Sequence, residues 1–229
     1  MSRKSLAHLG NIDPVMKGLI AAVGPCRIEV QDQCPPFQSL ARAIAHQQLH
    51  ASAARAILAR LVAGCGGGRF PTPQSLLAAK DAELRANGFS FAKIAALKDL
   101  AAKTIEGIVP ERRALEGLSD LEIIERLTQV RGIGRWTVEM MLMFHLGRPD
   151  VLPVDDFGVR TGFRHAYALR KIPPPKVLAA YGERWGPYRS TAAWYLWRAV
   201  ELERAGTLPA PLERIRLPRL ARRRRKKRA

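Results

Sequence analysis

Two glycines and two aspartates are the residues of this 229-residue chain whose types and spacing point most directly to chemistry. Gly132 and Gly134 flank Ile133, and Asp155 and Asp156 follow about twenty residues later. A Gly-x-Gly turn leaves backbone N–H groups uncovered, and at a helix N-terminus such groups attract anions. Because the net charge is +18, we expect the anion to be a nucleic-acid phosphate. One aspartate can cap the next helix, and since two adjacent caps are redundant, the other is expected to face a cleft.

The glycine turn must be held by a helix on each side. Ser119 and Glu122 have the spacing of a capping box, which predicts a helix over 119–129. Trp136 and the apolar residues that follow it at helical spacing predict a second helix over 135–147. An ordinary interhelical turn remains the alternative for the glycines, and a pair of helix caps remains the alternative for the aspartates.

Helical periodicity also dominates the rest of the chain, and no alternating runs would build a sheet. We predict an all-α protein with two helical lobes and a cleft between them. The two ends of the chain would form one lobe, and the middle would form the other. Further helices are predicted over 12–23, 37–48, 51–64, 73–79, 90–107, 156–169, 175–184 and 188–204.

Composition and charge narrow the class of protein. A hydrophobic content of 47% supports a packed core, and no apolar run approaches the roughly 20 residues that span a bilayer. We therefore expect a soluble protein of the cytoplasm, associated with the nucleoid, or with the nucleus in a eukaryote. Ten basic residues and no acidic ones occur between Arg214 and Arg228, which predicts a disordered basic tail over 214–229. The tail either adds affinity for phosphates or only solubilises the chain.

The stretch 119–164 resembles the helix-hairpin-helix–Gly/Pro–Asp superfamily of DNA glycosylases. Within it the chain is most similar to 3-methyladenine DNA glycosylase II in its short, yeast-type form, and a looser resemblance extends over 12–203. The resemblance implies a glycosylase domain over 1–213, with lobes over 37–147 and over 1–36 plus 148–213. It also implies a DNA-binding cleft between the lobes and the absence of the β-rich N-terminal domain of longer members.

The implied activity is hydrolysis of the N-glycosidic bond of alkylated purines, such as 3-methyladenine and 7-methylguanine, in double-stranded DNA. The family's catalytic aspartate falls on Asp156, whose carboxylate would stabilise an oxocarbenium-like sugar or activate water. Asp155 would then cap the helix or support its neighbour. Members that also cut the strand carry a lysine where this chain has Trp136, so the enzyme is expected to be monofunctional.

A pocket for the flipped base is implied by the aromatic residues late in the chain. The resemblance places Trp197 against the base, opposite Trp136, with Tyr188 and Met140 completing the pocket. Aromatic faces attract the positive charge of an alkylated base. Met140 stands where some relatives have tyrosine and would give a softer wall. Packing in a core is the alternative for these aromatic residues.

Two further segments are implied to contact DNA. The segment 45–50 matches the family's Gln-Gln-Leu wedge loop at Gln47, Gln48 and Leu49. Leu49 would fill the gap left by the flipped base, with Gln48 near the opposite strand and His50 beside it; an ordinary surface histidine is the alternative for His50. Lys93 is expected to contact a phosphate. The hairpin would contribute Arg131, Gly132, Gly134, Arg135 and Thr137.

The resemblance also bears on cofactors and partners. Main-chain carbonyls of Thr128, Val130 and Ile133 would hold a monovalent cation, Na⁺ or K⁺, and no cofactor is required for activity. No cysteine follows Cys65, so the iron–sulfur cluster of some members is not expected. Double-stranded DNA is the expected partner of a monomer, with no membrane association. A glycosylase for other base lesions and a non-catalytic helix-hairpin-helix DNA-binding module are the alternatives.

Overall fold

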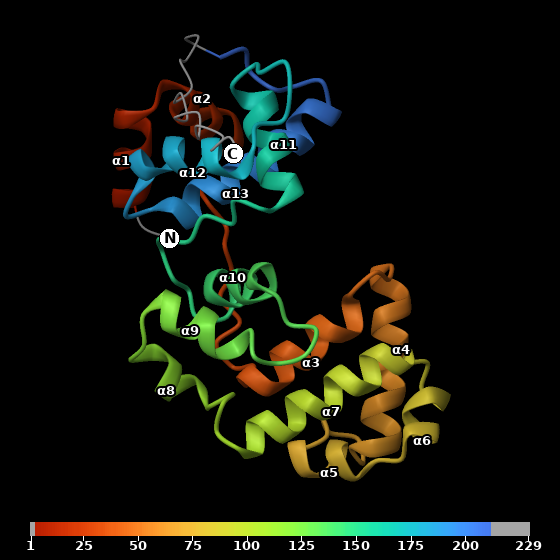
Figure 1. Cartoon of the computed structure of the whole chain (residues 1–229). Helices are drawn as coiled ribbons and strands as arrows, with labels where there is room; N and C mark the ends of the chain where they lie inside the picture. The colour runs from red at the N-terminus through yellow and green to blue at the C-terminus, as the bar shows by residue number, and fades with distance from the viewer. Residues whose placement is uncertain (1–2, 212–229) are drawn as a thin grey trace, which may run out of the picture. The chain divides into compact units, whose positions relative to one another are not determined.

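The computed structural model describes residues 3–211, and every regular element in this range is helical (Figure 1). The all-α prediction is therefore confirmed. The elements are α1 (Arg3–Ile12), α2 (Pro14–Val23), α3 (Pro36–His46), α4 (Ala51–Cys65), α5 (Pro73–Ala78), α6 (Asp81–Ala86), α7 (Phe91–Ile105), α8 (Arg112–Glu116), α9 (Asp120–Leu127), α10 (Arg135–Phe144), α11 (Phe157–Ala166), α12 (Pro175–Gly182), a 3-10 helix η1 (Glu183–Trp185) and α13 (Arg189–Arg204).

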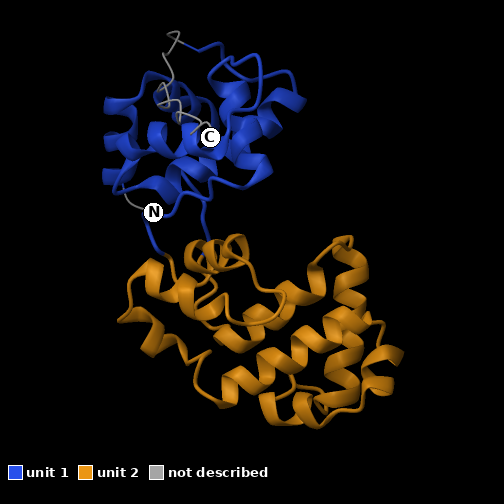
Figure 2. Cartoon of the chain, in the orientation of Figure 1, with its two compact units in different colours: residues 1–29, 148–229 blue, residues 30–147 orange. Residues whose placement is uncertain are grey.

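The chain divides into two compact units, shown in different colours in Figure 2. We call residues 30–147 the central unit, and residues 1–29 with 148–229 the terminal unit. Residues 30–36 were predicted to lie with the ends of the chain, but they belong to the central unit. One reason is that the Gln31 amide donates a 2.8 Å hydrogen bond to the carbonyl of Phe144, at the end of α10.

Helix α7 is the main packing element of the central unit, and it contacts α3, α5 and α6. Ser90 caps its N-terminus by accepting a hydrogen bond from the Lys93 amide. Ile94, Leu97 and Leu100 recur at helical spacing and are buried, so one stripe of α7 faces the core. Two segments that the sequence predicts to contact DNA, the loop after α3 and the turn after α9, lie in this unit.

In the terminal unit, α11 packs along α13, and α2 also contacts α13. The unit has a buried carboxylate, Asp13, which is 0% exposed. Its Oδ2 accepts hydrogen bonds from the Tyr167 hydroxyl at 2.6 Å, the Trp185 indole at 3.0 Å and the Tyr181 hydroxyl at 3.3 Å. Burial, followed by the nearby Asp13 charge, raises the pKa of both tyrosines. The carboxylate therefore ties the N-terminal helices to the C-terminal ones.

The structure corrects one predicted helix and adds three short ones. The predicted helix 12–23 begins only at Pro14, because Asp13 caps it with its side chain and Pro14 occupies the first turn. A separate helix, α1, precedes it and was not predicted. The short helices α6 and α8 were also missed, since six and five residues are too few to show a helical period.

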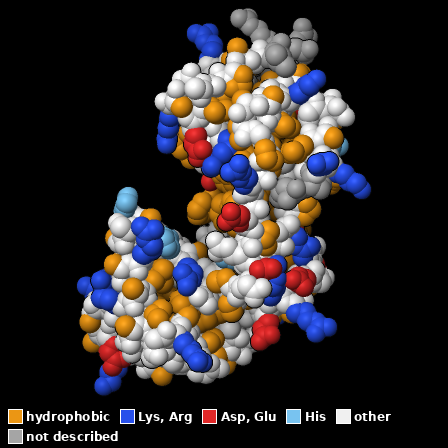
Figure 3. Space-filling view, turned by 180° about the vertical axis from the view of Figure 1, so that it is seen from behind, with side chains coloured by type: hydrophobic (Ala, Val, Ile, Leu, Met, Phe, Trp, Pro, Cys, Tyr) orange, Lys and Arg blue, Asp and Glu red, His pale blue; other side chains and the backbone are white. Residues whose placement is uncertain are grey.

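No helix among residues 3–211 has the length and apolar character needed to cross a membrane. Lys and Arg side chains are spread over both units on the face shown in Figure 3, consistent with the excess of basic residues in the sequence. The predicted basic tail over 214–229 lies outside the described residues.

Candidate functional site

The helix-hairpin-helix motif predicted around the glycines is present as α9, a tight turn and α10. Ser119 and Glu122 form the predicted capping box of α9. Gly132 has φ +77°, which favours glycine, and a Cβ there would also lie 3.3 Å from the Cβ of Ala96. Gly134 has an ordinary φ of −95° and serves as the N-cap of α10. Only the first glycine is thus needed for its conformation, while the second leaves the N-terminus of α10 uncovered.

The hairpin turn (residues 128–134) is anchored to α7 by a hydrogen bond from its backbone to an aspartate side chain. The Arg131 amide donates to Oδ2 of Asp99 at 2.6 Å, and Lys103 donates to both oxygens of the same carboxylate at 2.8 Å. Burial raises the pKa of the Asp99 carboxyl, but the Arg131 and Lys103 hydrogen bonds outweigh it and bring that pKa below its usual value. Asp99 is thus held as an anion that fixes the turn.

Three predicted cation ligands lie in the same turn. The Val130 amide donates to the Leu127 carbonyl at 3.1 Å, and the Ile133 amide donates to the Val130 carbonyl at 3.0 Å. The side chains of Val130 and Ile133 are buried, while the Thr128 hydroxyl donates to the carbonyl of Ile124. Of the three predicted ligands, the Val130 carbonyl thus accepts a hydrogen bond within the turn.

The first turn of α10 carries three of the predicted residues. Arg135 donates a 2.8 Å hydrogen bond to Glu139, whose side chain is almost completely buried. The Arg135 guanidinium is 56% exposed, so this ion pair leaves it accessible to a phosphate. Trp136 is 49% exposed, and Thr137 is half-buried beside it. The arrangement leaves an exposed aromatic face next to a basic side chain.

The predicted wedge segment is an exposed turn between α3 and α4, and we call residues 47–50 the wedge turn. Gln48 has φ +55°, an unusual conformation for a residue other than glycine. Leu49 is 40% exposed although it is apolar. His50 caps α4, and its Nδ1 lies 2.9 Å from the Ser52 hydroxyl. The turn thus exposes an apolar side chain between two polar residues.

The Lys93 side chain has a hydrogen-bond partner within the protein. Its ammonium donates a 2.7 Å hydrogen bond to the carbonyl of Ala45, near the C-terminus of α3. Burial lowers the pKa of the Lys93 amine. A cation is favourable at the end of a helix, so the residue predicted to contact phosphate holds α3 just before the wedge turn.

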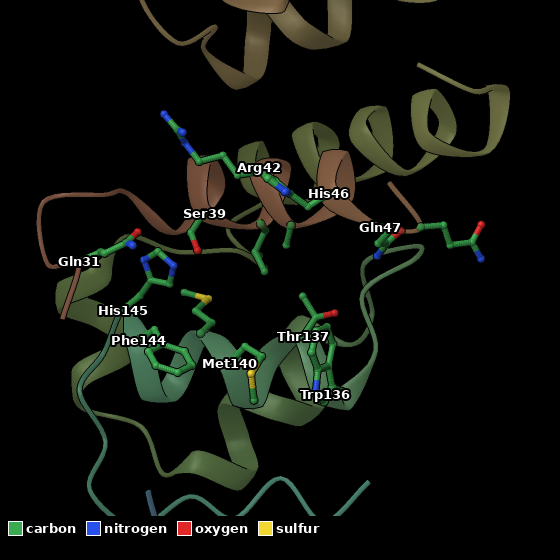
Figure 4. A pocket seen from close by; sticks show the side chains of 14 residues that line it. Gln31, Ser39, Arg42, His46, Gln47, Trp136, Thr137, Met140, Phe144 and His145 are labelled. Atoms are coloured by element: carbon green, nitrogen blue, oxygen red, sulfur yellow. The ribbon is translucent and has the colours of Figure 1, made fainter. Parts of the chain in front are cut away.

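A cavity of about 690 Å³ lies in the central unit between α3 and α10 (Figure 4). Trp136, Thr137 and Met140 line it from α10, and His46 and Gln47 line it from the end of α3. Trp136 and Met140 therefore line one cavity of the central unit, whose lining does not include Trp197 or Tyr188.

Asp156 lies in the terminal unit at the N-terminus of α11. Its Oδ1 accepts a 2.7 Å hydrogen bond from the Val159 amide and thereby caps the helix. Either aspartate was expected to cap the helix, and Asp155 was expected to cap it or to support Asp156; the N-cap is Asp156, and Asp155 is exposed. The residue predicted to be catalytic is therefore also the helix cap, and the helix N-terminus favours its carboxylate in the anionic form.

Trp197 on α13 donates a 2.9 Å hydrogen bond from its indole nitrogen to Oδ1 of Asp156. Gly158 makes the approach possible, since a Cβ there would lie 2.8 Å from the indole Cδ1 and 3.1 Å from Oδ1. Tyr188, also in this unit, packs edge-on against His8 with ring centroids 5.3 Å apart. Of the residues predicted near the base, Asp156 and Trp197 are thus in direct contact, while Tyr188 packs against α1.

Four residues that shape these sites were not predicted. Asp13 had a sequence signal, the Asp-Pro pair of a helix start. Gln47 stands in the Gln-Gln-Leu match of the wedge loop, but its bond to Gly132 had no signal, and Asp99 had none either, because the partners are distant in sequence. Phe157 follows Asp156, and its side chain is 69% exposed. Hydrophobic periodicity would not predict an exposed phenylalanine at this position. Among residues 3–211, no cluster of three or more His, Cys, Asp or Glu side chains could hold a metal ion.

Comparison with known proteins agrees with this arrangement. Residues 41–187 match the family described as HhH-GPD superfamily base excision DNA repair protein. The chain is 44% identical to DNA-3-methyladenine glycosylase 1 of Schizosaccharomyces pombe over 200 residues, which cover 87% of this chain and 88% of that protein.

Solved structures give the same result. The fold is similar to that of the S. pombe 3-methyladenine DNA glycosylase in complex with abasic DNA, with a TM-score of 0.79, covering 87% of this chain and 97% of that one. It is also similar to a DNA-3-methyladenine glycosidase from Bacillus halodurans, at 33% identity and a TM-score of 0.80, covering 89% and 92% of the two chains. The chain belongs to the HhH-GPD superfamily of base excision DNA repair proteins.

Proposed function

We propose that this chain is a monofunctional DNA glycosylase that hydrolyses the N-glycosidic bond of alkylated purines in double-stranded DNA. The observation that carries the proposal is the Asp156 carboxylate, held on Oδ1 by the Val159 amide and the Trp197 indole. It occurs in a chain 44% identical to a protein named DNA-3-methyladenine glycosylase 1. We expect the enzyme to act where the genome lies, in the nucleoid or the nucleus.

The carboxylate has the properties that the reaction needs. Cleavage of the bond leaves positive charge on the sugar, and a fixed negative charge beside it lowers the barrier. Asp156 can also orient the attacking water or accept its proton. Because the indole and amide donors hold one oxygen in place, the carboxylate need not reorganise as the charge develops.

The expected product of the reaction depends on whether an amine is placed to attack the sugar. Strand cleavage would need an amine that attacks the sugar, and position 136 is tryptophan. No lysine occurs in the sequence between Lys103 and Lys171. Water is then the nucleophile, and an abasic site in an intact strand is the product.

The central unit supplies the surfaces for DNA. The hairpin turn offers backbone amides at the N-terminus of α10 with Arg131 and Arg135 beside them, which suits a phosphate. The wedge turn offers Leu49 to fill the gap left by a flipped base. Trp136 and Met140 offer a cavity wall for that base.

The hairpin is also proposed to hold Na⁺ or K⁺ on the carbonyls of Thr128, Val130 and Ile133. Neutral carbonyl oxygens suit hard cations, and the buried side chains of Val130 and Ile133 fix the turn that presents them. A bound cation would add positive charge where the phosphate lies. Affinity for abasic duplex DNA should therefore be higher in KCl than in tetramethylammonium chloride of equal ionic strength.

The direct test is a panel of duplexes with single defined lesions, treated with the protein and then with hot alkali. Strands containing 7-methylguanine or 3-methyladenine should break only after alkali, and undamaged strands should stay intact. Borohydride should trap no protein–DNA crosslink, because no Schiff base forms. Release of 8-oxoguanine but not of alkylated bases, or robust trapping, would contradict the proposal.

A further inference from the structure

Gln47 links the two turns of the central unit that the proposed function assigns to DNA. It is the C-cap residue of α3, and its side-chain Nε2 donates a 2.8 Å hydrogen bond to the carbonyl of Gly132. The two residues are 85 positions apart in the sequence. The bond therefore connects the wedge turn directly to the hairpin turn, and Gln47 also lies at the end of the cavity beside Trp136 (Figure 4).

Both turns are also anchored on α7. Lys93 of this helix holds the Ala45 carbonyl just before the wedge turn, and Asp99 holds the Arg131 amide in the hairpin turn. One helix thus fixes the base of each turn. The Gln47 bond adds a connection between their exposed ends, which completes a closed frame.

The Gly132 carbonyl is oriented for this bond by an unusual backbone. The φ of +77° at Gly132 sets the direction of the peptide, and Ala96 of α7 packs close beneath it. Gly132 is exposed and Gln47 is half-buried, so water can replace the bond at little cost to folding. The bond therefore contributes little to folding stability, and its role is to fix the distance between the two turns.

We propose that Gln47 is a positioning residue for base flipping, which rests on the proposed function. The hydrogen bond from its side-chain amide fixes the position of the wedge turn relative to the hairpin turn. When the hairpin is seated on the phosphates, Leu49 is thereby aligned with the base stack. Catalytic geometry is lost steeply when a positioned group shifts, so a loosened wedge should slow extrusion of the base more than it weakens binding.

The test compares Gln47→Met and Gln47→Glu with the unchanged protein. Methionine keeps the length of the side chain but cannot donate, and glutamate places a negative oxygen against the carbonyl. Single-turnover release of 7-methylguanine paired with cytosine should slow roughly three- to tenfold in Gln47→Met, the effect of one hydrogen bond. The slowing should be larger in Gln47→Glu.

A second substrate separates positioning from a general loss of structure. Extrusion costs least when the base is unpaired, so the same lesion is placed opposite an abasic site. The slowing should then shrink to within about twofold. Affinity for an undamaged duplex should stay within about twofold, since the phosphate contacts are kept.

Gln38→Met is the matched control, because Gln38 lies on the same helix and is placed in neither turn. It should release both lesions at the rate of the unchanged protein. Equal slowing of paired and unpaired lesions by Gln47→Met, or no slowing of either, would overturn the inference while leaving the proposed function intact. Failure of the unchanged protein to release either lesion would overturn the proposed function and this inference with it.

Discussion

The indole nitrogen of Trp197 and Oδ1 of Asp156 are joined by a 2.9 Å hydrogen bond between α13 and α11. The same oxygen accepts the Val159 amide at 2.7 Å. Two donors on one oxygen fix the plane of the carboxylate and stabilise its charge. Trp197, which is expected to form a wall of the base pocket, is thus also a hydrogen-bond donor to Asp156.

Replacing Trp197 with Phe should separate these two roles. Phenylalanine keeps an aromatic face but removes the N–H donor. A hydrogen bond to a charged group contributes about 1.5–3 kcal/mol, so the single-turnover rate at saturating enzyme should fall about tenfold or more. Affinity for abasic duplex DNA should change much less, and an unaffected rate would show that the indole donor does not assist the acid.

Asp156→Asn should abolish base release without unfolding the protein. Asparagine is as good an N-cap as aspartate, so α11 should persist and the free energy of unfolding should change by less than about 1 kcal/mol. Loss of the negative charge removes a stabilisation often worth about 3–4 kcal/mol. Asp155→Asn is the matched control, because that side chain is exposed; a rate loss as large in the control would contradict the assignment.

Gly158→Ala should reduce the rate of base release through a steric clash. The added Cβ would lie 2.8 Å from the Trp197 ring, so the ring, the carboxylate or both must shift. We expect slower base release and little change in affinity for undamaged DNA, measured side by side with Gly18→Ala, where a Cβ meets nothing within 4 Å. Full activity in Gly158→Ala would mean that the close approach of Trp197 is dispensable.

Local patterns predicted the long helices and the hairpin, because Ser119, Glu122 and the apolar stripes are signals within a few residues of each other. The family resemblance singled out Asp156 and Trp197, whose catalytic and pocket roles remain predictions. The bond between those two could not be predicted, since it depends on how α11 packs on α13. Gln47 and Gly132, 85 residues apart, meet for the same reason. Contacts set by tertiary packing leave no period or motif in the sequence.

Asp13→Ala should strongly destabilise the terminal unit. Removal of the carboxylate leaves buried donors of Tyr167, Tyr181 and Trp185 without their acceptor. Each unsatisfied buried group costs about 1–3 kcal/mol, so the free energy of unfolding should fall by several kcal/mol in urea titrations. Asp13→Asn, which keeps an acceptor, should lose less, and equal stability of the alanine variant would contradict this role.

The pH dependence of stability should carry a contribution from Asp99. Its carboxyl pKa lies below the usual 3.8, because the Arg131 and Lys103 hydrogen bonds outweigh burial. The folded form therefore binds the proton less tightly, so the stabilisation is present above about pH 4 and is lost as pH falls through the folded pKa. Asp99→Asn should flatten the acid limb of unfolding free energy below about pH 4. An unchanged acid limb would show that Asp99 does not contribute.

The partners of Asp13 come 154, 168 and 172 residues later in the chain. A ribosome makes the N-terminal end first, so α1 and α2 emerge long before the helices that cover them. The central unit is contiguous, and all its contacts are available once residue 147 has left the exit tunnel. The acid at the start of α11 gains its indole donor only when α13 has emerged. A chain released before α13 would contain the whole hairpin turn and wedge turn but would lack the indole donor of Asp156.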